Sequence, residues 1–255
     1  MPSTETHRCC VCANETEIRC AACSAVGTDL FFCSKEHQKL VWKVHKRFCR
    51  QAIFEHPLLE PEEAEHAKRI AVIRAIAPLL PGQPLESSAA TAFIGSVIDT
   101  VTSTSAHPVA QRLSGPTRQG AAQVIRAFLL NDPSRAPDHP LLTPFAFLAH
   151  IEQRIIDRLA DPAVHRRSWY PVFMHRLAVV LAVFAAPQRM EPAASSSPAA
   201  HETYRELTAL CGAAYAGLVE LVESRVRPVE SEAVVAAIRG ALGDTFWVPN
   251  EDEKD

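Results

Sequence analysis

The sequence has few of the features that mark exported or membrane proteins. The longest strongly apolar stretch, 177–186, falls well short of the roughly eighteen residues that a bilayer-spanning helix needs. The opening residues MPSTETHRCC contain no apolar segment of the kind found in signal peptides, and the formal net charge is −3. We therefore expect an intracellular protein, in the cytoplasm or the nucleus, without a membrane anchor.

Sequence motifs of common catalytic sites are also absent. We find no triad-like pattern, P-loop, Rossmann glycine motif or H-E-x-x-H pattern. His165 and His175 are each followed by arginine, which a solvated helix face or a capped helix end explains more simply than a catalytic cluster. Cys211 lies in an Ala/Leu-rich segment and is expected to be a small buried hydrophobe. We expect no enzymatic activity, and an uncharacterised helical enzyme is one alternative.

Cysteine, in contrast, is abundant at one end of the chain. Seven of the eight cysteines lie within the first fifty residues, where six of them and two histidines form four pairs in the order C-x2-C, C-x2-C, C-x3-H and H-x3-C. The pairs are Cys9/Cys12, Cys20/Cys23, Cys33/His37 and His45/Cys49. A structural zinc ion takes four N or S ligands, and short chelating pairs supply two at a time. The spacing favours two structural zinc ions over free thiols or disulfides, with Cys10 as a spare thiol.

The segment from Cys9 to Cys49 resembles the MYND-type zinc finger. The resemblance includes all eight ligand positions and also Ser34, Gln38, Trp42 and Lys46. It implies cross-bracing, in which the first and third pairs bind one zinc and the second and fourth pairs bind the other. Site 1 is then Cys9, Cys12, Cys33 and His37, and site 2 is Cys20, Cys23, His45 and Cys49. The family usually has cysteine at the position of His37, but imidazole is also a good zinc ligand.

The resemblance also implies a function in protein–protein interaction. In MYND-type fingers a shallow groove beside the helix takes a proline-rich peptide, commonly in transcriptional repressors. The matching positions are Gln38, which would hydrogen-bond to the peptide backbone, and Trp42, which would supply an apolar platform. A second interpretation of Trp42 stays open, because a large aromatic side chain can instead pack the small core of the finger. Ala21 and Ala22 stand where groove-forming relatives can have serine, so the peptide specificity is open too.

A basic stripe on the predicted finger helix supports a different function. Lys35, Lys39, Lys43 and Lys46 recur at helical spacing and would face phosphates together. A solvated face is the simpler interpretation, because no aromatic residues are interleaved with the lysines. The alternative to a protein-interaction module is therefore a zinc module that contacts nucleic acid.

The rest of the chain is predicted to be helical and resembles no family that we recognise. It lacks the Asn-His-Ser-Cys-type motif of SET methyltransferases. Good helix formers and apolar residues at three- and four-residue spacing predict helices, with most prolines between them. The predicted helices are 62–80, 88–101, 117–130, 143–159, 169–184, 202–225 and 231–242.

The predicted fold class is mostly α: a small zinc-stabilised cross-braced finger followed by an all-α helical domain. Within the finger we expect a short hairpin with its turn at Gly27, and then a helix that is capped by Ser34 and ends near Phe48. The predicted segments are a flexible tail 1–8, the finger 9–51, a linker 52–61, the helical domain 62–248 with a flexible loop at about 187–200, and an acidic tail 249–255.

Overall fold

We describe a computed structural model of the 255-residue chain. The described residues are 7–57, 59, 64–65, 67, 122, 125–126, 142–161, 163–188 and 197–243. The predicted helices 62–80 and 117–130 lie largely outside these residues, and the predicted helix 88–101 lies entirely outside them. The acidic tail 249–255 and most of the predicted loop 187–200 also fall outside the described part of the chain.

The chain divides into two compact units. One consists of Met1–Phe54 together with Phe147–Asp255, and the other of Glu55–Ala146. The N-terminal segment therefore shares a compact unit with the C-terminal helices. The boundaries expected from the sequence concern which parts fold independently, and they stay a prediction.

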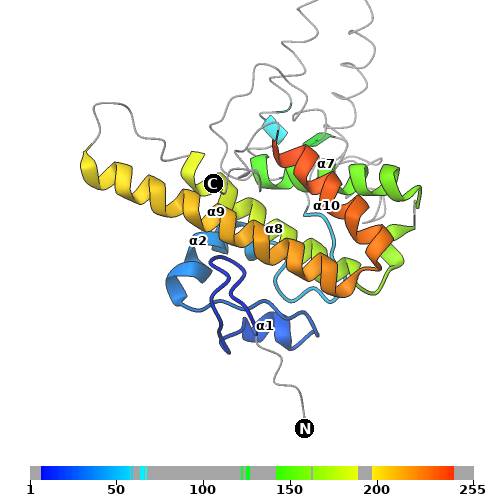
Figure 1. Ribbon diagram of the computed structural model, residues 1–255, viewed down its shortest axis with the longest axis horizontal. Coiled ribbons are helices and arrows are strands. Elements are labelled where there is room, and N and C mark those ends of the chain that lie inside the picture. The colour runs from blue at the N-terminus through cyan, green and yellow to red at the C-terminus, as the bar shows by residue number, and fades with distance from the viewer. Residues whose placement is uncertain are drawn as a thin grey trace, which may run out of the picture. The chain divides into compact units, whose positions relative to one another are not determined.

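The described elements are all helical. In chain order they are α1 (Ala21–Ser24), α2 (Lys35–His45), α7 (Leu142–Leu159), the 3-10 helix η2 (Val164–Arg166), α8 (Tyr170–Gln188), α9 (Pro198–Arg225) and α10 (Pro228–Gly243) (Figure 1). The four long C-terminal helices confirm the helices expected at 143–159, 169–184, 202–225 and 231–242, with ends that differ by at most four residues. The mostly α fold class is confirmed for the described residues.

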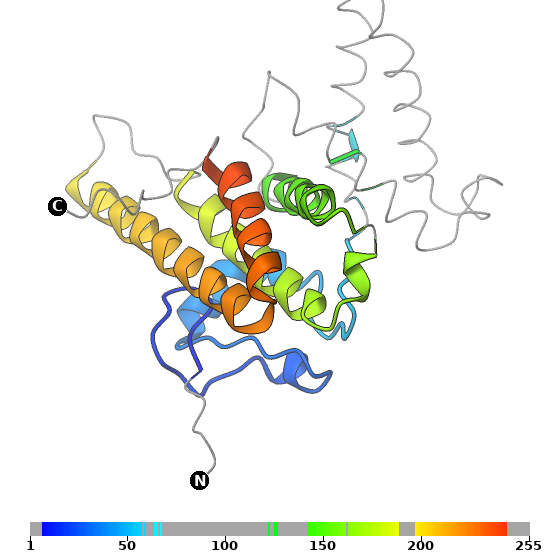
Figure 2. The same ribbon diagram turned by 45° about the vertical axis from the view of Figure 1, so that its right-hand side comes forward.

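Helix α8 is the central element of its unit, with α2 on one side and α9 on the other (Figures 1 and 2). Every residue from 173 to 185 is buried. By length and composition alone, α8 and α9 are both apolar enough to cross a membrane, which the sequence analysis did not expect. In the window Tyr170–Pro187 of α8, 83% of the residues are buried inside the protein, against 33% for α9. Packing in a protein core accounts for the composition of α8.

In the described C-terminal helices the prolines lie in the first turn, with the exception of Pro187. Ser197 caps α9 by accepting a hydrogen bond from the Ala200 N–H, and Pro198 occupies the first helical position. Pro187, which the sequence analysis placed in a loop, instead lies in the last turn of α8. A proline has no N–H to donate to the carbonyl four residues earlier, here that of Val183. The buried thiol of Cys211 lies 3.7 Å from this carbonyl oxygen, so Cys211 links α9 to α8 as well as filling space.

The N-terminal segment contains backbone pairing but no strand among residues 7–57. Isolated antiparallel bridges join Arg8 to Glu15 and Arg19 to Phe31. Around the second bridge, the Cys20 N–H donates to the Leu30 carbonyl and the Phe32 N–H to the Ile18 carbonyl. The hairpin expected within residues 24–32 is therefore a pairing of residues 18–20 with 30–32. The loop between them contains α1 and Gly27, whose φ is +79°.

The segment that follows α2 packs against α8 through an aromatic cluster. The ring of His175, on α8, lies 5.2 Å from the Phe48 ring and 5.1 Å from the Phe54 ring, both at nearly perpendicular angles. The His175 side chain is fully buried, and its Nδ1 lies 2.7 Å from the Pro171 carbonyl oxygen. Burial lowers the pKa of His175, so the imidazole is neutral. His175 is thus a core residue and does not belong to the solvated face expected from the sequence.

Candidate metal centre and the helix surface beside it

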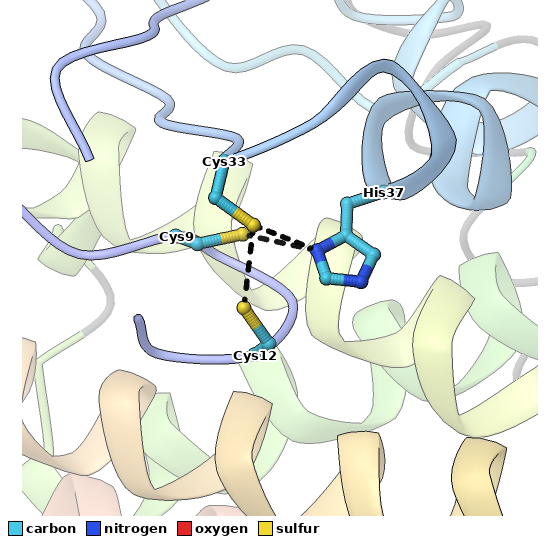
Figure 3. Close-up of side chains that lie close together, drawn as sticks. All are labelled: Cys9, Cys12, Cys33 and His37. Atoms are coloured by element: carbon cyan, nitrogen blue, oxygen red, sulfur yellow. Dashed lines mark hydrogen bonds between the residues drawn. The ribbon is translucent and has the colours of Figure 1, made fainter. Parts of the chain in front are cut away.

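Four side chains from two separate segments converge at the first metal centre (Figure 3). The Sγ atoms of Cys12 and Cys33 are 3.5 Å apart, and His37 Nδ1 lies 3.1 Å from Cys33 Sγ and 3.6 Å from Cys9 Sγ. Zinc–sulfur bonds of about 2.3 Å place tetrahedral sulfur ligands about 3.8 Å apart. The observed spacing fits a zinc ion at the centre of the group.

Local backbone structure sets these ligands in place. The Ser34 hydroxyl accepts a hydrogen bond from the His37 N–H, which fixes the first turn of α2 and with it the imidazole. The Cys9 N–H donates to the Asn14 carbonyl at 2.8 Å, and Ala13 has a φ of 59°, so the loop that carries the first cysteine pair turns back on itself. The N-cap expected for Ser34 is confirmed, although α2 ends at His45 and not near Phe48.

The second metal centre is more deeply buried than the first. The His45 Nε2 atom lies 3.4 Å from Cys20 Sγ and 3.7 Å from Cys23 Sγ. Cys49 Sγ lies 3.8 Å from Cys20 Sγ and 3.7 Å from Cys23 Sγ. Cys20 and Cys23 come from the start and the body of α1, whereas His45 and Cys49 come from the end of α2 and the turn after it. These distances fit a second tetrahedral zinc site.

The two centres are cross-braced. One group of possible metal ligands consists of Cys9, Cys12, Cys33 and His37, and the other of Cys20, Cys23, His45 and Cys49. Each group combines a pair from the first half of the segment with a pair from the second half. Cys10 belongs to neither group, and burial raises the pKa of its thiol, as expected for a spare, neutral cysteine.

The pKa differs from one ligand to the next. Burial raises the pKa of Cys9, but the backbone N–H groups of Cys33, Cys12 and Val11 outweigh it and lower the pKa to about 7. Burial and the neighbouring thiols raise the pKa of Cys33 to about 12. Burial lowers the pKa of His45 to about 4, which keeps its imidazole neutral, as a zinc ligand must be. A thiol with a raised pKa, such as that of Cys33, therefore loses its proton only when the metal binds.

Each centre offers four protein ligands, which is the arrangement of a structural zinc site. A catalytic zinc site keeps one position for water or substrate, and neither group of ligands leaves such a position. These ligands therefore stabilise the fold of the N-terminal segment by binding metal.

The two predicted peptide-binding residues follow one another on α2 at a spacing of one turn. Trp42 is 44% exposed, and its ring lies 5.7 Å from that of the zinc ligand His45. Gln38 is half-buried. The buried residues of α2 are Val41, Val44 and His45. Trp42 therefore lies outside the described core.

The fold and the ligand geometry define the class of this segment as a zinc-binding module with two cross-braced Cys3His sites. Residues 9–49 match the sequence model of the MYND finger, so this segment of the chain is a MYND finger. Domains of this type generally mediate protein–protein interactions. No curated protein and no solved structure matches the chain.

Sequence reasoning missed the residues that join the finger to the helices. It assigned His7 and Arg8 to a flexible tail, but the His7 ring stacks on Phe31 at 4.1 Å, and Arg8 forms an ion pair with Glu220 on α9. It also placed Phe54 in a linker, although Phe54 is 7% exposed. The one available signal was the aromatic character of Phe48 and Phe54, which lie on either side of the last ligand, Cys49, and this indicates burial but not a partner.

Proposed function

We propose that this protein is a non-catalytic interaction or scaffold protein inside the cell, in which the MYND finger binds a proline-rich segment of a partner protein. The proposed binding surface is the part of α2 that carries Gln38 and Trp42. Transcriptional regulation is the setting that we propose for this interaction.

The exposure of Trp42 is the observation that carries the proposal. Other large aromatic residues of the finger are in the core, with Phe32 at 1% and Phe48 at 0% exposure, whereas Trp42 is 44% exposed. A half-exposed indole that contacts a fixed imidazole offers a rigid apolar surface. Proline-rich ligands suit such aromatic surfaces because their extended backbone is already ordered before binding.

Gln38 supplies the polar part of the proposed surface. It precedes Trp42 by four residues, so both side chains project from the same side of α2. Within the described part of the chain, its amide makes no hydrogen bond, and Gln38 is half-buried. An amide of this kind can donate to a carbonyl of an extended peptide, which lacks internal hydrogen bonds.

The lysine stripe provides the second candidate function, contact with nucleic acid. Lys35, Lys39, Lys43 and Lys46 are all exposed. Glu36 and Trp42 lie among these lysines in the sequence. Because the lysines are close to Trp42, the surface also suits a peptide that carries acidic residues beside its prolines. The two candidates differ in their expected salt dependence, which is steep for phosphate contacts.

The test is a binding measurement on the full chain with a displayed library of proline-containing dodecapeptides and with a random-sequence DNA duplex of about 20 base pairs. We expect selected peptides to bind and Trp42→Ala to weaken them by roughly tenfold or more, about 1.4 kcal/mol. Ile53→Ala is the matched control, because Ile53 is an apolar side chain with 70% exposure that lies outside α2.

Each variant is checked for two zinc ions by native mass spectrometry. Peptide binding that survives Trp42→Ala in a zinc-loaded finger would contradict the proposed surface. Salt-sensitive DNA binding without peptide binding would favour the nucleic-acid function.

A further inference from the structure

A cavity of about 520 Å³ lies between the start of the finger and helices α8 and α9. The finger contributes His7, Arg8 and Asp29 to its lining, and the helices contribute Arg176, Glu220 and Arg225. The volume lies within the range of small-molecule sites, roughly 300–1,000 Å³. Neither Gln38 nor Trp42 lines this cavity, so it is separate from the proposed peptide surface.

Arg176 is the residue that gives the cavity a chemical preference. Its side chain belongs to α8 and is 9% exposed. Its Nε atom is buried without a hydrogen-bond partner, and among the described residues no carboxylate forms an ion pair with it. A buried guanidinium without an anion is unfavourable, whereas an anion that reached it would gain charge-assisted hydrogen bonds.

Gly217 on α9 makes room for this guanidinium. A Cβ atom at Gly217 would lie 3.4 Å from the Arg176 Nη2 atom, at the close limit of ordinary van der Waals contact. The absence of a side chain lets the guanidinium lie against the α9 backbone. Packing thus holds the planar donor group of Arg176 at the cavity wall, and a fixed donor loses little conformational entropy when it binds an anion.

The acidic residues of the cavity already have partners. Glu220 lies 3.5 Å from Arg8, and Asp29 lies 3.5 Å from Arg19. The lining contains three arginines, Arg8, Arg176 and Arg225, and two acids, so its formal charge is +1 when histidine is left out of the count. One negative charge would bring the formal charge of the lining to zero, whereas a dianion would leave an excess negative charge.

We propose that this cavity binds a monoanionic carboxylate, either of a small organic acid or of a peptide, with Arg176 as its main partner and Arg225 at the exposed rim. Guanidinium and carboxylate groups have matching planar geometry for two parallel hydrogen bonds. The stacked rings of His7 and Phe31, which are 4.1 Å apart and inclined by 9°, provide a flat wall against which a planar apolar part of the ligand can pack.

The test uses the full zinc-loaded chain and four probes: benzoate, its neutral isostere benzamide, phenyl phosphate, and a short peptide with either a free or an amidated C-terminus. Calorimetry gives the affinities, and the side-chain Nε–H NMR signal of Arg176 reports contact. We expect benzoate to saturate the site, to shift this signal and to bind at least tenfold more tightly than benzamide. Comparing the free with the amidated peptide distinguishes a peptide carboxylate from a small acid.

Two variants test the arginines of the cavity, so that the result does not depend on a single variant folding correctly. Arg176→Met removes the buried cation, and Arg225→Glu changes an exposed side chain and turns the formal charge of the lining from +1 to −1. We expect each to weaken benzoate binding at least tenfold. Arg158→Met is the matched control, because Arg158 is an exposed arginine on α7 that does not line the cavity.

Several results would overturn the proposal. They are equal binding of benzoate and benzamide, tighter binding of phenyl phosphate than of benzoate, unchanged affinity in Arg225→Glu, or no saturation up to about 50 mM benzoate. Failure of the proposed peptide binding at Trp42 would not affect the benzoate result, because the peptide-binding surface of α2 and the cavity share no residue.

Discussion

The finger and the C-terminal helices hold their folds by different means, although they share one compact unit. In the finger, eight metal ligands are spread over 41 residues, and the described backbone includes two isolated bridges and two helices. In α8, thirteen consecutive residues, 173–185, are buried on all sides. The finger depends on coordination bonds, whereas α8 depends on being surrounded by apolar partners.

The finger therefore packs against α8 and covers part of it, in addition to being a zinc-binding module. Phe48 lies between the ligands His45 and Cys49 of the second centre, and its ring contacts those of His45 and His175. A finger that has lost its metal cannot hold Phe48 against α8. The metal sites therefore stabilise part of the helical core indirectly, through this aromatic contact.

The largest expected effect comes from removing a metal ligand. Cys23→Ala should lose the zinc of the second centre and unfold the finger, because structural zinc contributes about 10–16 kcal/mol to the folding of small zinc domains. Unfolding should also lower the melting temperature of the C-terminal helices, since α2 no longer covers α8. Native mass spectrometry and thermal circular dichroism measure both changes.

Cys10→Ala is the matched control for this prediction. Cys10 is 2% exposed but belongs to neither ligand group, so the variant should keep two zinc ions and lose about 1 kcal/mol or less from a small cavity. Two zinc ions in Cys23→Ala, or one in Cys10→Ala, would contradict the ligand assignment.

The next effect concerns the contact between the two regions. Phe48→Ala removes a fully buried ring and should cost about 3–5 kcal/mol in urea unfolding, with two zinc ions retained in the folded protein. Phe54 is 7% exposed, so Phe54→Ala should also lower the free energy of unfolding, but by less than Phe48→Ala. A cost below about 1 kcal/mol for Phe48→Ala would mean that the finger and α8 fold without one another.

Zinc affinity should rise with pH, because a protonated thiol must release its proton before it binds metal. The raised pKa of Cys33, about 12, makes this residue contribute up to a tenfold gain in affinity per pH unit throughout the neutral range. Cys9, with a pKa of about 7, should contribute below pH 7 and progressively less above it. His45, with a pKa of about 4, should contribute nothing above about pH 5.

Competition with a chromophoric chelator from pH 6 to pH 8 measures this dependence. The zinc affinity should rise across this range. The slope of its logarithm against pH counts the protons released on binding, and it should fall by up to one as the free Cys9 thiol loses its proton. An affinity that does not change with pH would show that the free finger already holds thiolates.

The smallest effects come from one substitution made in both regions. Gly27→Ala should destabilise the finger by about 1–2 kcal/mol, because its φ of +79° disfavours any residue with a Cβ. Gly212→Ala should stabilise α9 by about 0.5–1 kcal/mol, because a Cβ there meets nothing within 4 Å and alanine is the better helix former. Chemical denaturation measures both, and equal signs would show that the two glycines do not differ as described.

Much of the finger could be predicted from the sequence because its information is local. Chelating pairs with two or three residues between ligands, and a serine that caps the helix three residues before His37, depend only on short-range geometry. The resemblance to MYND-type fingers supplied the pairing of these chelates into two sites. The C-terminal helices were equally accessible, since apolar periodicity and the prolines between them are local signals too.

The contacts between distant segments were not accessible in this way. Nothing in the spacing shows that Phe48 meets His175, that the thiol of Cys211 faces the carbonyl freed by Pro187, or that His7 and Arg8 border a cavity with Arg176. Each of these contacts joins segments that are far apart in the sequence, and periodicity reports only that a side chain is buried and not what covers it.

The sequence by itself therefore determined the eight zinc ligands, the helix that carries the exposed Trp42, and the four C-terminal helices. Only the tertiary packing shows that the finger covers α8 and that Arg176 is buried beside a cavity with no carboxylate partner among the described residues. The physical reason is that ligand spacing and helical periodicity are properties of neighbouring residues, whereas burial, charge pairing and cavities arise only when distant segments pack together.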